Sequence, residues 1–548
     1  MFKTLYRFDK WLDSHLILIF LLALLLVLRL PNFFEPYWYG DEGIYLTIGN
    51  GLRQGKVLYR DIIDHKTPII YYLAMVPSQL DFRLLNLAWM SVTVIAFYHL
   101  CKELLAREWT IVLATLLFVV LTSLPWLEGN IPNGELFVMG FILIGFYFLS
   151  GTKLFNDFFK AKSSWLDIGL GNKEETLSVF WPKLFAHEQA LFYLSGIFFG
   201  LGILTKVPAL FDLVAAGSIW WLVLSKQILA GSRTWFGQLR ELVLSGVSVL
   251  FGAATVILFS VFYFVLRGAG AEYLQFGLLY NFRYAGSWDL GLNNPVLSFL
   301  LSMSGKLLIL ALVLSFVTIF IKKLRPTVQF VSLWFALSLF GTLLSSRPYP
   351  HYFLQLVPSF CLLLALNFDA WLRVWQKNRW QLTANWKKFN FFETGLSLFL
   401  LFLTVQAFLI LQVKPYPALA YYSNFERLVT GRLSTAEYYN RFESLMADNY
   451  AASKLIKDSG EQEIFIWGTN PTLYALTKTS PTGRFTVSFH IKDFKAYEES
   501  LASVVKKRPF FVVVMNNENT DLPGLYSFLE QHYIPNTTFE HFTLWKLL

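Results

Sequence analysis

The first 413 residues alternate between long apolar segments and polar connections. A helix that crosses the hydrocarbon core of a bilayer, which is about 30 Å thick, needs about 20 apolar residues. The first segment has no small-residue cleavage site after Leu28, so we interpret it as a retained anchor. Lys206 and Pro208 make the 190–225 region the least regular. The pattern predicts about eleven membrane spans, at residues 14–31, 82–101, 109–126, 134–152, 190–205, 207–225, 242–266, 295–321, 327–345, 352–372 and 393–413.

Residues 414–548 follow a different pattern, which is typical of a small α/β unit. Ser/Thr capping signals predict a helix over 434–457. Apolar runs at 464–467 and 510–515 predict strands, with helical segments near 493–506 and 521–531. A last strand is expected over 538–547. The alternation predicts a short, largely parallel sheet, and no internal repeat is visible.

Lysine and arginine placement predicts the orientation, because cytoplasmic connections of membrane proteins carry an excess of both. An N-terminus inside the cell makes every second connection cytoplasmic, and an odd number of spans then puts the tail outside. We therefore expect a multi-pass protein of the cell inner (plasma) membrane, with an extracytoplasmic C-terminal domain. The basic residues of the N-terminal segment and these connections are Lys3, Arg7, Lys10, Lys102, Arg107, Lys153, Lys160, Lys162, Lys173, Lys183, Lys226, Arg233, Arg240, Lys322, Lys323, Arg325, Arg373, Lys377, Arg379, Lys387 and Lys388.

Composition supports the membrane interpretation. Of 548 residues, 55% are hydrophobic and only 15% are charged, which excludes a disordered chain and an ordinary soluble enzyme. The net charge is +9, but residues 414–548 hold 14 basic and 14 acidic groups, so the whole excess belongs to the membrane part. With no basic stripe on a soluble face, we expect no nucleic-acid partner. Cys101 and Cys361 lie in or beside apolar runs and are interpreted as structural thiols.

The first external loop, residues 32–80, concentrates polar chemistry. Apolar residues about four apart, Ile44, Ile48 and Leu52, predict an amphipathic helix at the membrane interface, with Asp41 and Glu42 at its N-terminus. Capping of that helix is the structural alternative for both acids. The loop also holds Arg60, His65 and Lys66. An acid beside cations suits a reaction that deprotonates one partner and stabilises a phosphate leaving group on the other.

A series of motifs in and after this loop resembles the membrane-embedded GT-C glycosyltransferases. Within that class it is similar to the bacterial relatives of protein O-mannosyltransferases and to the lipid A aminoarabinose transferases. Lys66-Thr67-Pro68 departs from the Lys-Pro-Pro that is frequent there, which leaves the subfamily and substrate open. The motifs are Asp41-Glu42-Gly43-x-Tyr45, Gly55-Lys56-x-x-Tyr59-Arg60-Asp61, Asp64-x-Lys66-x-Pro68, Glu128-Gly129-Asn130, Asn133-Gly134-Glu135-Leu136-Phe137, Gly196-x-x-x-Gly200-Leu201-Gly202-x-Leu204-Thr205-Lys206, Arg347-Pro348-Tyr349-Pro350-His351-Tyr352 and Trp467-Gly468-Thr469-Asn470-Pro471-x-x-Tyr474.

The resemblance implies a fold and a reaction. The fold is a polytopic α-helical GT-C catalytic domain over residues 1–413, followed by a small extracytoplasmic α/β domain over 414–548. The reaction moves a sugar from a polyprenyl-phosphate donor to a hydroxyl of a protein, lipid or glycan acceptor, with inversion at the anomeric carbon. A polytopic transporter and a lipid-linked glycan ligase or polymerase are the alternatives. A transporter would place ionisable groups near the centres of its spans.

The resemblance also implies roles for individual residues. Asp41 is the general base, with the adjacent Glu42 as the alternative, and Glu135 (or Glu128) orients the acceptor or caps a helix. For Lys206 the structural alternative is a snorkelling cation, and for Arg347 and His351 it is interfacial anchoring. The candidates for binding the donor phosphate are Arg60, Lys66, Lys206, Arg347, His351 and Tyr352, with Arg283 as a further cation.

A cofactor is not assigned from the sequence. GT-C enzymes differ in their need for a divalent metal ion. His65 beside Asp64, together with His351, offers metal ligands, but the spacing is too long-range to define a site. The glycine-rich run at 196–202 lies inside a predicted span, where small residues allow close helix packing, and it is not a nucleotide loop.

Overall fold

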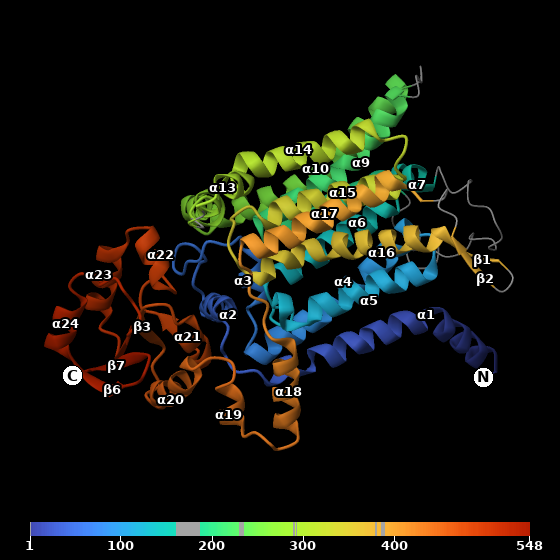
Figure 1. Cartoon of the computed structure of the whole chain (residues 1–548). Coiled ribbons are helices and arrows are strands. Elements are labelled where there is room, and N and C mark those ends of the chain that lie inside the picture. The colour runs from blue at the N-terminus through green and yellow to red at the C-terminus, as the bar shows by residue number, and fades with distance from the viewer. Residues whose placement is uncertain are drawn as a thin grey trace.

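A computed structural model describes residues 2–160, 187–229, 235–288, 291, 293–378, 381–384 and 389–548. Long helices lie side by side in a bundle, and the C-terminal unit covers one end of it (Figure 1). The main bundle helices are α1 (Phe2–Arg29), α4 (Gln79–Leu104), α5 (Glu108–Ser123), α6 (Gly134–Ser150), α8 (Glu188–Ile203), α9 (Leu210–Leu229), α10 (Trp235–Leu266), α14 (Met303–Ile319), α15 (Pro326–Thr342), α16 (Val357–Val374) and α17 (Phe391–Ile410).

Each segment predicted to cross the membrane is helical in the described chain. Six helical segments are long and apolar enough to cross a bilayer, or eight if each of two bent pairs counts as one span. The bent pairs are α6 with α7 (Lys153–Lys160) and α13 (Pro295–Leu301) with α14. Helices α5, α8 and α15 are apolar but shorter. The helical membrane architecture is therefore confirmed, while the count of eleven spans stays a prediction.

The two ends of the bundle differ. The N-terminus, α7 and the hairpin of β1 (Trp375–Asn378) and β2 (Gln381–Ala384) lie at the end away from the C-terminal unit (Figure 1). These elements belong to the segments predicted to be cytoplasmic. The predicted cytoplasmic segments and the predicted extracytoplasmic C-terminal unit therefore lie at opposite ends of the bundle. The orientation in a membrane stays a prediction. The predicted cytoplasmic residues Lys162, Lys173, Lys183, Arg233, Arg379, Lys387 and Lys388 lie outside the described residues.

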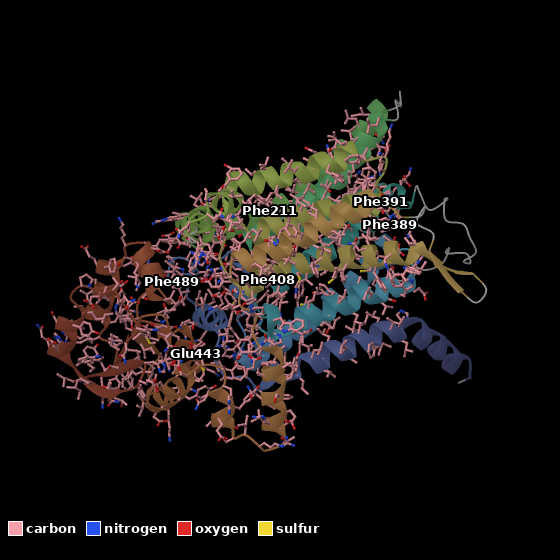
Figure 2. All side chains as sticks on the ribbon, viewed as in Figure 1. Phe211, Phe389, Phe391, Phe408, Glu443 and Phe489 are labelled. Atoms are coloured by element: carbon pink, nitrogen blue, oxygen red, sulfur yellow. The ribbon has the colours of Figure 1, made fainter. Side chains whose placement is uncertain are left out.

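Aromatic side chains pack between the bundle helices, and Figure 2 labels two of them, Phe211 and Phe408. The ring of Phe211 on α9 lies 4.9 Å from that of Phe340 on α15, and Phe408 on α17 lies 4.4 Å from Phe353. Both cysteines are buried and unpaired by disulfide, as expected for structural thiols.

Glycines allow α8 and α10 to touch. A Cβ added at Gly196 would lie 1.9 Å from the carbonyl oxygen of Val249, and one at Gly200 would lie 2.4 Å from Val256. Such distances exclude any side chain unless the helices separate. The glycine-rich run is thus a packing surface inside a helix, as the sequence indicated.

Short elements form the end of the bundle that meets the C-terminal unit. Helix α2 (Gly40–Arg53) lies against α21 (Pro471–Thr477) so closely that a Cβ at Gly43 would be 2.8 Å from the Thr472 nitrogen. The predicted amphipathic helix therefore exists but is buried rather than lying on a membrane surface. The short elements are η1 (Leu30–Phe34), α2 (Gly40–Arg53), α3 (Ile69–Leu73), η2 (Pro125–Leu127), η5 (Val207–Ala209), α11 (Gly270–Glu272), the π-helical η6 (Tyr273–Leu279), α12 (Tyr280–Ala285) and η7 (Pro350–Leu356).

The C-terminal unit is an α/β structure around a five-stranded sheet with strand order β4-β3-β5-β7-β6. Strands β3 and β4 and strands β3 and β5 pair in parallel, whereas β5 with β7 and β6 with β7 are antiparallel. The strands are β3 (Glu463–Trp467), β4 (Ser480–Pro481), β5 (Phe511–Met515), β6 (Tyr533–Thr538) and β7 (Phe542–Leu547). The helices are α18 (Ala418–Val429), α19 (Thr435–Tyr439), α20 (Leu445–Asp458), α21, α22 (Ser488–Asp493), α23 (Tyr497–Lys507) and α24 (Leu525–His532).

Three details of this unit differ from the sequence-based expectation. The sheet is mixed instead of largely parallel, because the segment predicted as one last strand is the end of a hairpin formed by β6 and β7. The helix expected over 434–457 is broken into α19 and α20, since a capping box at Ser434 and Glu437 starts only a short helix. The domain boundary after residue 413 stays a prediction.

The α8–α10 contact gives a direct test of the bundle packing. We expect Gly196→Leu to destabilise the protein by about 1–3 kcal/mol or more, because the new side chain overlaps the α10 backbone. Gly217→Leu is the matched control, since nothing lies within 4 Å of a Cβ at that position on α9. The measurement is the thermal unfolding of both variants in detergent, and equal melting temperatures would contradict this packing.

Candidate active site

Helix α2 presents two neighbouring acids to different surroundings. Glu42 is 1% exposed and forms two charge-assisted hydrogen bonds with Arg83 of α4, at 2.9 and 2.7 Å, and also accepts one from Gln79. Asp41 is 28% exposed at its side chain, and its Oδ2 accepts a hydrogen bond from the Lys66 ammonium at 3.1 Å. Successive helical residues point about 100° apart, which separates the two carboxylates. Glu42 is thus held in a closed ion pair, while Asp41 keeps solvent access.

Lys66 joins Asp41 to a second acid. Its ammonium nitrogen lies 3.9 Å from Oδ2 of Asp64 and 4.9 Å from the centre of the Tyr45 ring. Burial raises the pKa of Asp41, but Lys66 and His351 outweigh this effect and leave the pKa below its usual range. Burial lowers the pKa of Lys66, and Asp41 overcomes it, so this pKa is well above its usual value. Asp41 is therefore an ionised carboxylate beside a permanent cation.

Asp64 and His65 meet a histidine from the C-terminal unit. The Nε2 atom of His490 on α22 lies 3.1 Å from His65 Nδ1 and 3.2 Å from Asp64 Oδ1. Burial lowers the pKa of His490 to about 3, so its ring is neutral. Burial raises the pKa of Asp64, but Lys66 and His65 reverse this and hold it well below its usual value. The three side chains form a buried Asp-His-His group.

Glu128, Tyr39 and His351 form a second polar group. The Glu128 carboxylate lies 2.5 Å from His351 Nδ1 and accepts a hydrogen bond of 2.6 Å from the Tyr39 hydroxyl. Glu128 holds a left-handed backbone conformation, with φ of 56°, which costs energy for a residue other than glycine. The two contacts of Glu128 offset part of this energy. They also hold the His351 ring between the start of α2 and the end of η2.

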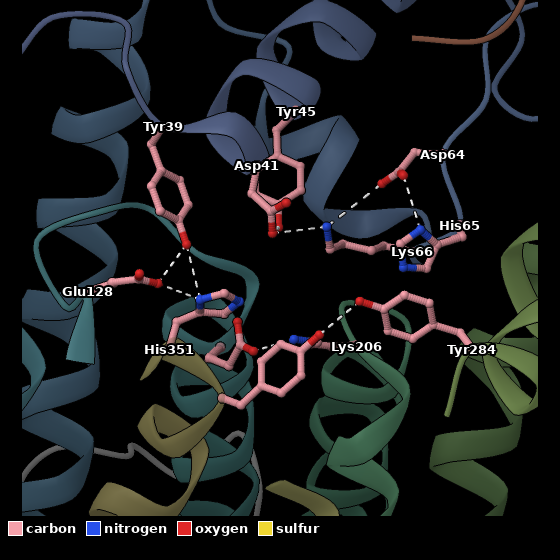
Figure 3. A network of polar contacts seen from close by, with 12 residues as sticks. Tyr39, Asp41, Tyr45, Asp64, His65, Lys66, Glu128, Lys206, Tyr284 and His351 are labelled. Atoms are coloured by element: carbon pink, nitrogen blue, oxygen red, sulfur yellow. Dashed lines mark hydrogen bonds and ion pairs between the residues drawn. The ribbon is translucent and has the colours of Figure 1, made fainter. Parts of the chain in front are cut away.

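A third group consists of Glu135, Lys206 and two tyrosines. Lys206 forms an ion pair with Glu135 at the start of α6, and its ammonium lies 4.0 Å from the centre of the Tyr352 ring. The Tyr352 hydroxyl is 3.2 Å from that of Tyr284. Figure 3 shows Tyr39, Asp41, Lys66, Lys206 and His351 converging on one space from different elements.

A cavity of about 680 Å³ opens beside these groups. Its polar lining includes His65, Lys66, Glu135, Lys206 and Tyr352, and hydrophobic side chains make up much of the remainder. A cavity that combines a mostly apolar wall with a few convergent polar groups is typical of a small-molecule site. The residues predicted from the first, second and late external loops are thus brought together around it.

Two arginines predicted to bind the donor phosphate, Arg60 and Arg347, do not line the cavity. Arg60 is exposed, forms an ion pair with its neighbour Asp61 and donates to the Arg267 carbonyl, so it does not join the cavity. Arg347 stacks on Tyr284 and Trp288, at 4.0 and 4.8 Å, and donates to Ser287. Arg347 therefore contacts two residues that line the cavity, Tyr284 and Trp288, but is not itself among the lining residues.

The sequence did not identify His490 or Tyr39 as candidates, and it paired Asp64 and His65 with His351 instead of His490. His490 is 425 positions from His65 and belongs to no metal-binding motif. Tyr39 lies two residues before Asp41, separated from it by Gly40, and that position is the only sequence signal for it.

The stabilities of variants at Asp41 and Glu42 distinguish the roles of these two acids of α2. We expect Glu42→Ala to lower the free energy of unfolding by about 3–5 kcal/mol, because it leaves Arg83 buried with part of its charge uncompensated. Asp41→Ala removes a partly exposed group and is expected to cost far less. Thermal unfolding of both purified variants measures the difference, and equal stabilities would refute it.

Comparisons with known proteins agree with this architecture. No protein-family model and no curated protein matches the chain. Among solved structures, ArnT from Cupriavidus metallidurans bound to undecaprenyl phosphate matches with a TM-score of 0.50 at 12% identity, over 96% of this chain and 97% of that chain. Its apo state gives a TM-score of 0.51 at 12% identity, over 97% and 98%.

An oligosaccharyltransferase from Archaeoglobus fulgidus also matches, with a TM-score of 0.42 at 13% identity, over 92% of this chain and 70% of that chain. The fold assignment rests on ArnT, whose likeness extends over nearly the whole of both chains. This chain therefore shares its overall fold with ArnT, in agreement with the fold expected from its sequence motifs.

Proposed function

We propose that this protein transfers a sugar from a polyprenyl-phosphate donor to an acceptor hydroxyl. The observation that carries the proposal is the Asp41–Lys66 pair, a solvent-accessible carboxylate hydrogen-bonded to a lysine that lines a large cavity. A base and a phosphate-binding cation are the two groups that this transfer requires. The ArnT structure with undecaprenyl phosphate supports the choice of donor class, since this chain has the same fold.

The reaction is a single inverting displacement. Asp41 accepts the proton of the acceptor hydroxyl as that oxygen forms a bond to the anomeric carbon. The bond from the anomeric carbon to the phosphate oxygen breaks, and the polyprenyl phosphate leaves with the bonding electron pair. Asp41 is preferred to Glu42 as the base because the Glu42 carboxylate is occupied by Arg83 and Gln79.

Lys66 and Lys206 bind the phosphate in this proposal. A lysine ammonium has three N–H donors, and Lys66 uses one of them on Asp41. Lys206 likewise donates to Glu135 and faces the Tyr352 ring. Each lysine retains donors for phosphate oxygens, and His351 and Tyr352 border the same space. Glu135 positions Lys206 and orients the acceptor.

We further propose that the site faces the extracytoplasmic side of the cell inner membrane. The positive-inside distribution supports this orientation, because the N-terminus, α7 and the β1–β2 hairpin, which belong to the basic segments, lie at the end of the bundle away from α2 (Figure 1). The donor sugar is unassigned, and the acceptor is a protein, lipid or glycan.

Asp41 is the first residue to test. We expect Asp41→Asn to lower sugar transfer by about 100- to 10,000-fold, because an amide cannot accept the proton. Cells that lack the protein are complemented with each variant, and mass spectrometry of their envelope glycans measures the product. Asp61→Asn, an exposed acid of the same loop, is the control and is expected to restore the product. Full restoration by Asp41→Asn would refute the proposal.

The phosphate site is tested by binding. We expect Lys66→Met to weaken the binding of undecaprenyl phosphate by about 10- to 100-fold, because hydrogen bonds to a charged group contribute about 1.5–3 kcal/mol. Arg60→Met is the control, because it removes a cation of the same loop that is paired with Asp61. We expect this variant to bind undecaprenyl phosphate with unchanged affinity. Titration of purified protein, followed by tryptophan fluorescence, measures both constants. An equal loss in the two variants would indicate a general charge effect.

A further inference from the structure

The Asp64-His65-His490 group has an unusual geometry. His65 Nδ1, His490 Nε2 and Asp64 Oδ1 lie at the corners of a nearly equilateral triangle with sides of 3.1, 3.2 and 3.2 Å. All three residues are buried, with exposed fractions of 6%, 0% and 0%. Ligand atoms about 2.0–2.1 Å from a tetrahedral ion are about 3.3 Å apart, so the triangle is close to the face of a metal site.

Hydrogen bonds alone do not satisfy this triangle. A neutral imidazole nitrogen is either a donor or an acceptor, and a carboxylate oxygen only accepts. If one ring nitrogen carries a proton, the other turns a lone pair toward the Asp64 oxygen. If both carry protons, two N–H groups face each other across 3.1 Å. A cation between three lone pairs removes the conflict, because all three atoms then act as ligands.

The surroundings have the charge and support that a cation needs. Asp41 and Asp64 contribute two negative charges and Lys66 contributes one positive charge. These three side chains together therefore carry a net charge of −1 beside the two histidines. The second oxygen of Asp64 accepts a hydrogen bond from the Tyr71 hydroxyl, which orients the carboxylate. The His65 ring packs on Tyr284, with 4.5 Å between the ring centres. The three ligands are therefore held in place before any ion binds.

We propose that Asp64, His65 and His490 hold a zinc ion that joins the first external loop to the C-terminal unit. Two imidazole nitrogens and one carboxylate oxygen are a ligand set that zinc accepts, with a fourth position left for water. Magnesium and calcium prefer sites made of oxygen atoms, so the histidines disfavour them. The Asp-His-His group replaces the Asp64, His65 and His351 set considered from the sequence, because His351 pairs with Glu128.

The ion would reinforce a connection that the backbone already makes. The Ile63 amide donates to the Arg484 carbonyl at 2.8 Å, one residue before Asp64. On the other side, the Tyr280 hydroxyl donates to Asp493, three residues after His490. A zinc ion between these contacts fixes the segment that carries Lys66. It acts by positioning and takes no part in the transfer, so it is independent of the proposed function.

Metal content tests the site. The full-length protein is purified with a tag that contains no histidine, incubated with zinc and dialysed, and its metals are measured by plasma mass spectrometry. We expect about one zinc per chain, and at least a 10-fold lower content in His490→Ala. His541→Ala is the matched control, because His541 belongs to the same unit and pairs with Asp448 away from the group. The control is expected to keep its zinc.

Two further variants separate ligand loss from misfolding. His490→Cys replaces one zinc ligand by another and is expected to retain the ion. Tyr71→Phe keeps all three ligands but removes the hydrogen bond to Asp64, and we expect zinc affinity to fall by about 10- to 100-fold. Cobalt loading gives a second readout, since a tetrahedral site with histidine ligands produces visible absorption bands that His490→Ala should lack.

Three outcomes would overturn the proposal. The first is a wild-type protein that binds no zinc after incubation, and the second is equal zinc content in wild type and His490→Ala. The third is binding of manganese or iron in preference to zinc, which would contradict the identity of the ion. Asp41→Asn is expected to keep its zinc, so failure of the transfer proposal and failure of the metal proposal are distinguishable.

Discussion

The site depends on the contacts of the Lys66 ammonium with two carboxylates. The ammonium lies between the carboxylates of Asp41 and Asp64, which come from α2 and from the segment before α3. Without this cation, the buried Asp64 and the partly exposed Asp41 would repel each other, which would favour protonation of one of them. With it, Asp41 stays ionised at the edge of the cavity. The same residue therefore sets the protonation of the proposed base and offers the donors that a phosphate would use.

Close backbone packing keeps Asp41 in this position. A Cβ at Gly43 would collide with Thr472 of α21, and one at Gly49 would lie 2.1 Å from the Ala74 carbonyl oxygen. Glu42 fixes the start of the same helix through its buried pair with Arg83. Helix α2 is thus held on several sides, while Asp41 in its first turn stays partly open to solvent. The adjacent acids have different tasks because their surroundings differ.

Most of the fold and part of the site follow from the sequence. Apolar length alone located the bundle helices, and alternation in the tail located β3 and β5. Lys66, Glu135 and Lys206 line one cavity, with Asp41 hydrogen-bonded to Lys66 and His351 close by (Figure 3), as the external loops suggested. The pairing of β6 with β7 and the His65–His490 contact were missed, because each depends on tertiary contacts that leave no local pattern.

The role of the C-terminal unit follows from its contacts rather than from its composition. Its neutral charge and α/β pattern predict a separate domain, yet its residues complete the end of the bundle that holds Asp41. Asn50 of α2 donates a hydrogen bond to the Lys478 carbonyl at 2.8 Å, and the Tyr421 hydroxyl donates one to Asn32 of η1 at 2.9 Å. His490 contacts the loop two residues before Lys66. Since the position of Lys66 decides the charge of Asp41, a displacement of this unit would change the proposed catalytic group itself.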